Sequence, residues 1–410
     1  MSLTTVADIG TYSTKVVAGT REGERIILRG VGKSKTGGVK NGRIVRPDKA
    51  GNSLKEATER AEEMASESIS SISLGVGGDC LEFTQNKATV TISSDDRIVT
   101  RGDVARLKDL VSSIDVGINR KIVSTIPHDF QLDGQKGVTN PVGLQGRRLD
   151  IVATLVTVEE KWIRNLDETS SRAGLELSGL VPLPQCLGEL LLSVEERDRG
   201  KTLIDFGMDT TKLLVFQNGR LKDQTVFKLG GKNLTGDLAA KLNTAREKAR
   251  RIKHEFVYLG DQTDRGSLDR TFREKFGEDD GEEVLTALSA RTKEIIELIL
   301  TDARENGHGR LLNYGIKITG GGARLAGLRE FLTERFEPRF EPGDPVYPVT
   351  GIRDVVEDPM YGPVLGLLSC ATGARSEKGK KSEARDSEGF DLLASARKII
   401  GSIFRKDPEQ

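Results

Sequence analysis

One pattern occurs twice in the sequence and constrains the fold more than any other feature. Over residues 6–18, a short apolar strand ends in Asp-x-Gly, a turn of small hydroxyl residues follows, and a Lys opens a second apolar strand. Residues 202–216 repeat this plan. A turn built from small residues offers backbone N–H groups and hydroxyls to an anion. A single copy is equally typical of an ordinary hairpin, but two copies predict two similar α/β domains that face each other across a cleft.

A third element lies further along the chain, over residues 316–325. An apolar strand there ends in three consecutive glycines that are expected to open a helix. Glycines let a flat ring lie against the backbone, and the start of a helix favours negative charge. The order and spacing of the three elements resemble the actin-like ATPase superfamily, which has two phosphate loops and one adenosine loop. The resemblance implies an α/β, actin-like fold with ribonuclease H-like duplicated domains around a nucleotide cleft.

The most specific family motifs lie outside these loops, at Ile126–Phe130, Val138–Leu144 and Gly146–Leu149. They are similar to the insert that the FtsA family, the bacterial actin homologues of cell division, carries in place of one actin subdomain. The similarity extends over residues 3–373. PilM, a pilus-assembly relative, is the nearest alternative family.

The resemblance also implies a division of the chain into subdomains. The first actin-like subdomain is expected at 1–82 plus 163–198, with 357–373 crossing back to it. The second is expected at 199–232 plus 312–356. An inserted FtsA-type subdomain at 83–162 and a further subdomain at 233–311 complete the folded part. A flexible linker at 374–389 and an amphipathic helix at 390–406 follow.

Hydrophobic periodicity predicts the principal helices independently of any family. Apolar residues recur at helical spacing over 53–68, 187–196, 285–306 and 361–374. Short apolar runs between these segments, such as residues 71–76, predict strands. Alternating helices and strands are typical of the α/β class.

The resemblance assigns ATP and Mg²⁺ to the cleft. Asp8 and Asp205 are expected to hold Mg²⁺ mostly through its waters, because Mg²⁺ keeps several of them. The alternative for Asp205 is a residue that only caps a turn. Gln185 lies near the place where actin-like proteins carry a water-orienting Gln. The expected ATP-binding residues are Asp8, Gly10, Thr11, Ser13, Lys15, Asp205, Gly207, Thr210, Thr211, Gly230, Gly231, Lys253, Gly320, Gly321 and Gly322.

Several positions depart from the family pattern. Met208 and Asp209 replace two glycines of the second phosphate loop, and Lys212 replaces an Asp. Arg250 stands where relatives have the Glu of an Ala-Glu-x-x-Lys motif, and Val181 stands where they often have Glu. A carboxylate at position 209 would repel phosphate unless it reached the metal. The sequence therefore predicts ATP binding, with slow or absent hydrolysis.

Composition excludes several classes of partner and site. The chain carries 62 acidic and 62 basic residues, so no overall field attracts nucleic acid. The cysteines, Cys80, Cys186 and Cys370, are far apart in sequence and are expected to be reduced thiols. The three histidines lack metal-ligand spacing, and no apolar run is long enough to cross a bilayer.

The last segment, residues 390–406, is predicted to bind membrane surfaces. Residues 374–389 before it are almost devoid of apolar side chains and are predicted to be a flexible tether. In a helix, the apolar residues would form one stripe with basic residues beside it. A helix docked on the protein itself is the alternative. The predicted membrane-binding residues are Leu392, Leu393, Arg397, Lys398, Ile399, Ile400, Ile403, Phe404 and Arg405.

The resemblance implies a function in assembly. An FtsA-type protein would form filaments with itself and tether FtsZ filaments to the cytoplasmic face of the inner membrane at the division septum. The C-terminal peptide of FtsZ would dock on residues 233–311, where Arg291 could contact an acidic peptide or be a plain solvated Arg. Other division proteins would bind the insert. A PilM-like pilus component and a sugar-kinase-like phosphotransferase are the alternatives, although no general base or sugar pocket is evident for the latter.

Overall fold

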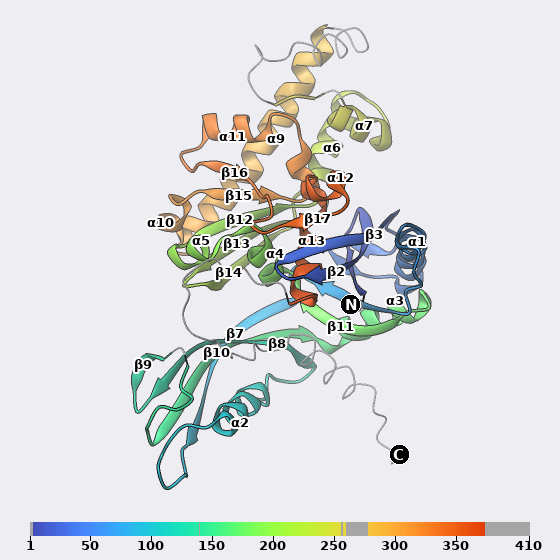
Figure 1. Cartoon of the computed structure of the whole chain (residues 1–410). Coiled ribbons are helices and arrows are strands. Elements are labelled where there is room, and N and C mark those ends of the chain that lie inside the picture. Colours follow the sequence, from blue (N-terminus) through green and yellow to red (C-terminus); the bar gives the residue numbers. More distant parts are fainter. Residues whose placement is uncertain (1–2, 139, 256, 260–277, 374–410) are drawn as a thin grey trace.

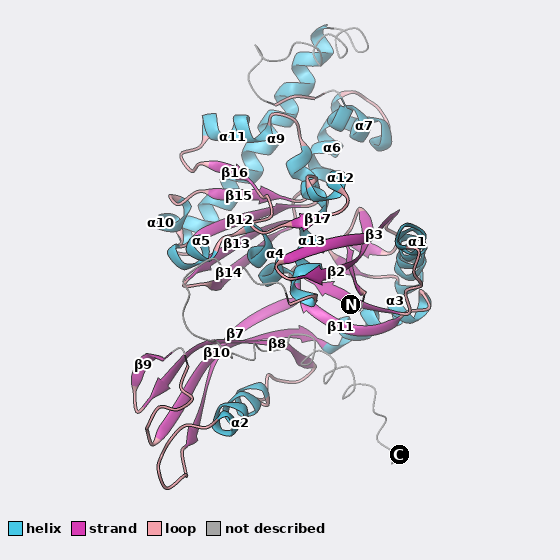
Figure 2. Ribbon diagram, viewed as in Figure 1, coloured by secondary structure: helices cyan, strands magenta, loops and turns pink. Residues whose placement is uncertain are grey.

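The computed structural model describes residues 3–138, 140–255, 257–259 and 278–373 (Figure 1). Helices and strands alternate along most of this length (Figure 2), which confirms the predicted α/β class. The predicted linker at 374–389 and the predicted helix at 390–406, with all the proposed membrane-binding residues, lie outside the described residues. Within the described part, no helix is both long and apolar enough to cross a bilayer.

The first large sheet begins with the hairpin predicted at the N-terminus. It has six strands in the order β11-β6-β1-β2-β3-β17. The strands β1, β2 and β3 form an antiparallel meander, and β6 and β11 continue the sheet in parallel beyond β1. The strands are β1 Thr4–Ile9, β2 Ser13–Glu22, β3 Arg25–Lys35, β6 Ser71–Val76, β11 Glu176–Pro182 and β17 Val349–Thr350.

The second large sheet repeats this plan with five strands, in the order β14-β13-β12-β15-β16. An antiparallel meander is again followed by two parallel strands on the side of its first strand. The duplication predicted from the two hairpins is therefore present in whole sheets. The strands are β12 Lys201–Phe206, β13 Thr211–Gln217, β14 Arg220–Phe227, β15 Ile316–Thr319 and β16 Phe340–Pro342.

A third sheet forms the insert and projects away from the two larger ones (Figure 1). Its order is β7-β10-β8-β9, with neighbouring strands antiparallel. The helix α2 packs on it through Leu107 and Val111, within a separate hydrophobic cluster. The elements are β7 Leu81–Thr91, α2 Arg101–Ser112, β8 Arg120–Leu132, β9 Gln135–Val138 and β10 Arg148–Glu159.

The remaining elements cover the sheets or connect them. A small hairpin, β4 Val39–Lys40 and β5 Arg43–Ile44, follows β3. The α-helices are α1 Pro47–Ala65, α3 Glu160–Arg172, α4 Leu183–Leu191, α5 Val194–Arg199, α6 Gly231–Lys241, α7 Arg246–Glu255, α9 Glu278–Glu305, α10 Gly309–Leu312, α11 Leu328–Arg335, α12 Arg353–Val356 and α13 Gly362–Ala371. The short 3₁₀ helices are η2 Gly321–Arg324 and η3 Pro359–Tyr361.

Two helices, α4 and α13, lie between the two large sheets. One hydrophobic cluster contains residues of both helices together with Val17 of the first sheet and Phe216 of the second. Gly366 lets the helices approach closely, because a Cβ built there would lie 3.0 Å from the Cys186 carbonyl oxygen. This helix pair therefore joins the two halves of the molecule.

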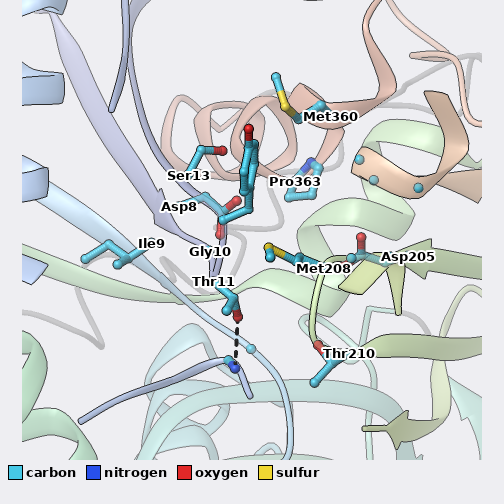
Figure 3. A pocket seen from close by; sticks show the side chains of 18 of the residues that line it. Asp8, Ile9, Gly10, Thr11, Ser13, Asp205, Met208, Thr210, Met360 and Pro363 are labelled. Atoms are coloured by element: carbon cyan, nitrogen blue, oxygen red, sulfur yellow. Dashed lines mark hydrogen bonds between the residues drawn. The ribbon is translucent and has the colours of Figure 1, made fainter. Parts of the chain in front are cut away.

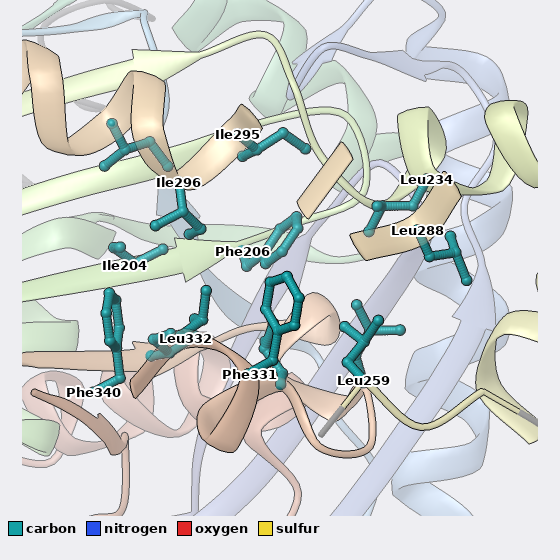
Figure 4. Packing of buried hydrophobic residues seen from close by; sticks show 14 of the residues in the cluster. Ile204, Phe206, Leu234, Leu259, Leu288, Ile295, Ile296, Phe331, Leu332 and Phe340 are labelled. Atoms are coloured by element: carbon teal, nitrogen blue, oxygen red, sulfur yellow. The ribbon is translucent and has the colours of Figure 1, made fainter. Parts of the chain in front are cut away.

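The core of the second half lies between its sheet and the helices α6, α9 and α11 (Figure 4). Phe206 at the end of β12 is completely buried, and Phe331 of α11 is 1% exposed. The periodic apolar face of α9 contributes Ile295 and Ile296 to the same cluster. This packing holds the end of β12, which carries the second Asp-x-Gly pattern, against the helices.

The structure differs from the sequence prediction mainly at helix ends. The helix predicted at 53–68 begins at Pro47, because proline is well suited to the first helical turn. The helix predicted at 187–196 is two helices, and Ser193 caps the second with Glu196 in a capping box. The glycine run at 320–322 opens the 3₁₀ turn η2 rather than an α-helix, and the next α-helix begins only at Leu328. The charge of a long helix N-terminus is therefore not available to a ligand at the glycines.

Candidate functional site

A large cavity lies between the two halves of the molecule. It encloses about 1310 Å³, including the part that is open to solvent. Its walls come from the turns of both Asp-x-Gly hairpins, from the glycine run that opens η2, and from α7. Figure 3 shows Asp8 and Thr11 on the side of the first hairpin, across from Asp205 and Thr210 of the second.

The first hairpin holds a buried ion pair at the cavity wall. Asp8 and Lys15 are cross-strand partners in β1 and β2, and the Lys15 Nζ lies 2.7 Å from the Asp8 Oδ2. Lys15 is only 5% exposed. In the turn, the Thr11 Oγ1 accepts a hydrogen bond of 3.2 Å from the backbone N–H of Gly42. The turn is therefore tied to the loop between β4 and β5.

The second hairpin repeats this ion pair. Asp205 and Lys212 are cross-strand partners in β12 and β13, with 2.7 Å between the Lys212 Nζ and the Asp205 Oδ2. Burial alone would lower the pKa of Lys212, but the carboxylates of Asp205 and Asp8 raise it above its ordinary value. The influence of Asp8 on Lys212 means that the two ion pairs share one electrostatic environment.

The glycine run approaches the second hairpin closely at Gly320 and Gly322. Gly320 has a φ of +87°, and a Cβ there would lie 2.5 Å from the Asp205 Oδ1. A Cβ on Gly322 would lie 2.4 Å from the ring of Phe206. At Gly321 a Cβ would meet nothing within 4 Å, although this glycine lines the cavity. A side chain at position 321 would therefore project into open space at the cavity wall.

The helix α7 brings a buried lysine to the cavity. Lys253 is 5% exposed, and its Nζ donates to the Gly231 carbonyl at 2.9 Å and to the Thr235 Oγ1 at 3.0 Å. Burial and the charge of Arg250 lower the pKa of Lys253 to about 8. Burial, followed by the charges of neighbouring cations, lowers the pKa of His254 to about 4. This wall of the cavity is thus cationic and would be stabilised by a bound anion.

The structure brings together most of the residues that the sequence assigned to the site. The exceptions among the predicted ATP-binding residues are Thr211, whose Oγ1 donates to the Leu229 carbonyl at 2.8 Å, and Gly230, which packs on the second loop. The predicted residues that line the cavity are Asp8, Gly10, Thr11, Ser13, Lys15, Asp205, Gly207, Thr210, Gly231, Lys253, Gly320, Gly321 and Gly322.

Gln185 is not among the residues that line the cavity. Its side chain is 7% exposed, and its Nε2 donates to the Glu189 Oε1 at 3.0 Å, one turn along α4. The Oε1 of Gln185 is buried without a hydrogen-bond partner among the described residues. This placement gives no support to a role for Gln185 in orienting water.

Arg291, assigned to a partner peptide, lies on α9 outside the cavity lining. Its guanidinium already makes a two-pronged contact with Asp237 of α6, at 2.5 Å from Nε and 3.3 Å from Nη2. A third contact, of 2.7 Å, reaches Glu294. The sequence allowed a plain solvated Arg, whereas the structure shows one that is engaged by two acids.

The residues that depart from the family pattern lie at different places relative to the cavity. Met208 lines the cavity, and Val181 is buried in the cluster between the sheets. The carboxylate of Asp209 contacts Asn41 and Lys232, and Asp209 is not among the lining residues. Arg250 lies over the ring of Tyr12. Asp209 is therefore not the unpaired carboxylate beside phosphate that the sequence suggested.

Some lining residues were not predicted as site residues. Trp162, Leu166, Met360 and Pro363 provide apolar surface from distant parts of the chain, and Arg324 lies two residues after the glycine run. The apolar ones carry no chemical pattern in the sequence. Arg324 had a usable signal, because a long basic side chain two residues after a ligand-binding turn lies within reach of the same ligand.

The carboxylates present suit Mg²⁺ better than a metal held by protein alone. Among the described residues there is no group of three or more His, Cys, Asp or Glu that could hold a metal ion. Asp8 and Asp205 are the acidic residues of the cavity lining. Mg²⁺ is commonly bound by one or two carboxylates together with waters and substrate phosphates. The donor set therefore fits Mg²⁺ that arrives with a phosphate ligand.

Comparisons with known proteins point to one family. A family model described as the SHS2 domain inserted in FtsA matches residues 78–157, and a model described as cell division protein FtsA matches residues 202–366. The cell division protein FtsA of Bacillus subtilis (strain 168) is 30% identical over 383 residues, covering 91% of this chain and 84% of that protein. The cell division protein FtsA of Streptococcus pneumoniae serotype 2 is 33% identical, and the match covers 81% of this chain and 73% of that protein.

Solved structures share the fold at lower identity. The PilM–PilN type IV pilus biogenesis complex aligns with a TM-score of 0.60 and 17% identity, covering 90% of this chain and 98% of that chain. The ethanolamine utilization protein EutJ from Carboxydothermus hydrogenoformans aligns with a TM-score of 0.53 and 15% identity, covering 91% and 90%. At such identities the likeness shows the fold alone, and it confirms the predicted actin-like architecture.

The titration of Lys253 predicts a pH-dependent contribution to stability. The folded pKa is about 8, below the ordinary value of 10.5. Between these values the unfolded chain keeps a proton that the folded chain has lost, so the free energy of unfolding rises with pH. The free energy of unfolding of the wild type, relative to that of Lys253→Met, should rise by on the order of 2 kcal/mol between about pH 7.5 and about pH 10. Urea titrations of both proteins at each pH measure this difference, and a constant or falling difference would contradict the assignment.

Proposed function

Because the chain belongs to the FtsA family of cell-division proteins, we propose that it binds ATP with Mg²⁺ in the interdomain cavity and links FtsZ filaments to the membrane. The single observation that carries nucleotide binding is the pair of Asp–Lys hairpins, which face one cavity beside a glycine run. Each hairpin contributes the same ion pair at the same register, as expected for two loops that hold one polyphosphate from opposite sides.

The residues that line the cavity divide naturally between the parts of ATP. The turns after Asp8 and Asp205 offer backbone N–H groups and hydroxyls to the β- and γ-phosphates. The two carboxylates would hold Mg²⁺ through its waters, and the metal would neutralise phosphate charge. Gly320–Gly322 would lie against the adenosine, with Lys253 behind it. Hydrolysis is proposed to be slow or absent, because Gln185 lies outside the cavity lining.

Two substitutions test nucleotide binding from opposite walls. Lys15→Ala removes the partner of a buried carboxylate, and Gly321→Asp places a negative side chain into open space at the cavity wall. Each should weaken the affinity for fluorescent ATP by at least about tenfold, since a lost charge-assisted contact is worth roughly 1.5–3 kcal/mol. Fluorescence titration measures the dissociation constants.

Gly236→Ala is a control for these two variants, because it lies on α6 outside the cavity lining and a Cβ there meets nothing within 4 Å. Its affinity for ATP should equal that of the wild type. If both cavity variants also bind as tightly as the wild type, the site is assigned wrongly.

We further propose the partners that the family assignment implies. The C-terminal peptide of FtsZ would dock on residues 233–311, other division proteins on the insert at 83–162, and further copies of the chain would form filaments. The division into subdomains stated above is part of this proposal. The location would be the cytoplasmic face of the inner membrane at the septum.

Arg291 offers a direct test of the peptide site. An acidic peptide would have to compete with Asp237 and Glu294, which already contact the guanidinium. Arg291→Glu should therefore weaken binding of the FtsZ peptide, whereas Asp237→Asn, which frees the guanidinium, should strengthen it. Each change is expected to be about threefold to tenfold, since such contacts are partly exposed to solvent. Fluorescence anisotropy of a labelled peptide measures both.

Lys293→Glu is the matched control for charge on the same helix, because Lys293 is exposed and pairs with Glu297. It should leave the peptide affinity close to that of the wild type. Equal affinities for Lys293→Glu and Arg291→Glu would remove Arg291 from the site.

The membrane link is proposed to be the segment 390–406. In a helix its apolar residues fall on one side, and each basic residue near an anionic surface contributes about 1 kcal/mol. Burial of Ile, Leu and Phe side chains adds about 1.5–3 kcal/mol for each one fully buried. Because the segment is short, we expect it to fold mainly on binding to the surface.

Co-sedimentation with anionic vesicles tests this link. The wild type should pellet, while Ile400→Glu and a chain truncated after Gly389 should stay in the supernatant, because each loses apolar contact with the bilayer. Ala394→Glu adds the same charge nearly opposite the apolar stripe and should still pellet in part. Pelleting of the truncated chain equal to that of the wild type would contradict the proposal.

The alternative functions receive less support. The likeness to PilM is structural at 17% identity, whereas the FtsA relatives reach 30% and 33% in sequence. A kinase would need a general base in the cavity. The carboxylates of its lining, those of Asp8 and Asp205, are both engaged by lysines.

A further inference from the structure

Two of the residues that depart from the family pattern, Asp209 and Arg250, make the same kind of contact. Each lies in the second half of the molecule, and each reaches across the cleft to a residue of the first half. Neither contact follows from the sequence of one loop alone. Together they suggest a role for these positions in how the cleft is held around its ligand.

The first bridge joins Arg250 of α7 to Tyr12 of the first hairpin. The Arg250 guanidinium carbon lies 5.0 Å from the centre of the Tyr12 ring, within the range of a cation–π contact. Both residues line the cavity. Arg250 also lies close enough to Lys253 to lower the pKa of that lysine. The ring of Tyr12 therefore gives this cation a favourable contact across the cleft.

The second bridge joins Asp209 to the loop between β4 and β5. The Asp209 Oδ2 accepts a hydrogen bond of 2.9 Å from the backbone N–H of Asn41. Lys232 of α6 completes the bridge, with its Nζ 3.2 Å from the Asp209 Oδ1 and 3.2 Å from the Asn41 Oδ1. Asp209 is 6% exposed, so this is a largely desolvated contact.

The first bridge joins the turn of the first hairpin to α7, and the second joins the turn of the second hairpin to the β4–β5 loop. The adjacent residue of that loop, Gly42, also donates to Thr11 of the first hairpin. Opening the cleft would therefore break both bridges and move both phosphate-side turns apart. A ligand held between the turns would be retained as long as the bridges are formed.

We propose that Tyr12, Arg250 and Asp209 are positioning residues of the nucleotide site, which tie ligand release to the separation of these two bridges. This inference rests on the proposed binding of nucleotide in the cavity. Removing a bridge should accelerate dissociation of the nucleotide more than it slows association, because the bridges act on the closed cleft.

Dissociation of a fluorescent ATP analogue, followed by stopped flow after addition of excess ATP, tests the first bridge. Tyr12→Ser and Arg250→Ala should each speed dissociation by about 2- to 30-fold, the range set by the strength of a cation–π contact. The double variant should dissociate no faster than the faster single variant, because both changes remove one contact. Tyr12→Phe keeps the ring and should resemble the wild type.

Arg251→Ala is the matched control for Arg250→Ala. Arg251 is the next residue of α7, and it is exposed and paired with Glu255. Its dissociation rate should equal that of the wild type. For the second bridge, Asp209→Ala should speed dissociation, and Asp209→Asn, which keeps an acceptor for the Asn41 N–H, should restore part of the slow rate.

The outcomes separate this inference from the proposed function. If the wild type binds no nucleotide, both are wrong. If the wild type binds nucleotide but Tyr12→Ser and Arg250→Ala dissociate at its rate, or if their effects multiply in the double variant, the bridge has no such role and only this inference is overturned. Urea unfolding of each variant without nucleotide shows whether a change in dissociation merely reflects a damaged fold.

Discussion

The site depends on one interaction that occurs twice, the buried pair of an aspartate and a lysine across a hairpin. Asp8–Lys15 and Asp205–Lys212 both have 2.7 Å between charged atoms. A buried charge that loses its partner is strongly destabilising, so neither member can be removed without disturbing the loop. The pairing holds each carboxylate at the cavity wall and places a positive charge beneath each turn. Two such loops that face each other could bind a polyphosphate and its metal ion between them.

The duplicated sheets bring the two loops into register. In each sheet the meander starts with the strand that ends in Asp-x-Gly, and a parallel strand follows on the same side. The helices α4 and α13 fill the space between the sheets, with Gly366 allowing close contact. Because both sheets pack on the same helix pair, a shift in that pair would alter the width of the cleft. The bridges at Tyr12 and Asp209 then act on a geometry that the helices have already set.

The features that sequence analysis predicted well are local ones. The hairpins and the glycine run carry their chemistry within a few consecutive residues, so the two-domain fold and the lining residues of these three elements followed from pattern and family resemblance. Contacts between distant residues did not follow. Asp209 accepts a hydrogen bond from Asn41, which is 168 residues away in the sequence. The sequence of neither loop indicates this contact. Gln185 was assigned by family resemblance alone, and the structure directs its side chain toward Glu189 of α4 and outside the cavity lining.

A crystal structure of the protein with a non-hydrolysable ATP analogue and Mg²⁺ is the most direct test of nucleotide binding between the two hairpins. We predict density for the triphosphate between the turns that follow Asp8 and Asp205, with the metal near both carboxylates and the adenosine against Gly320–Gly322. Density for the analogue at any other place, or an empty cavity at saturating analogue, would contradict the account.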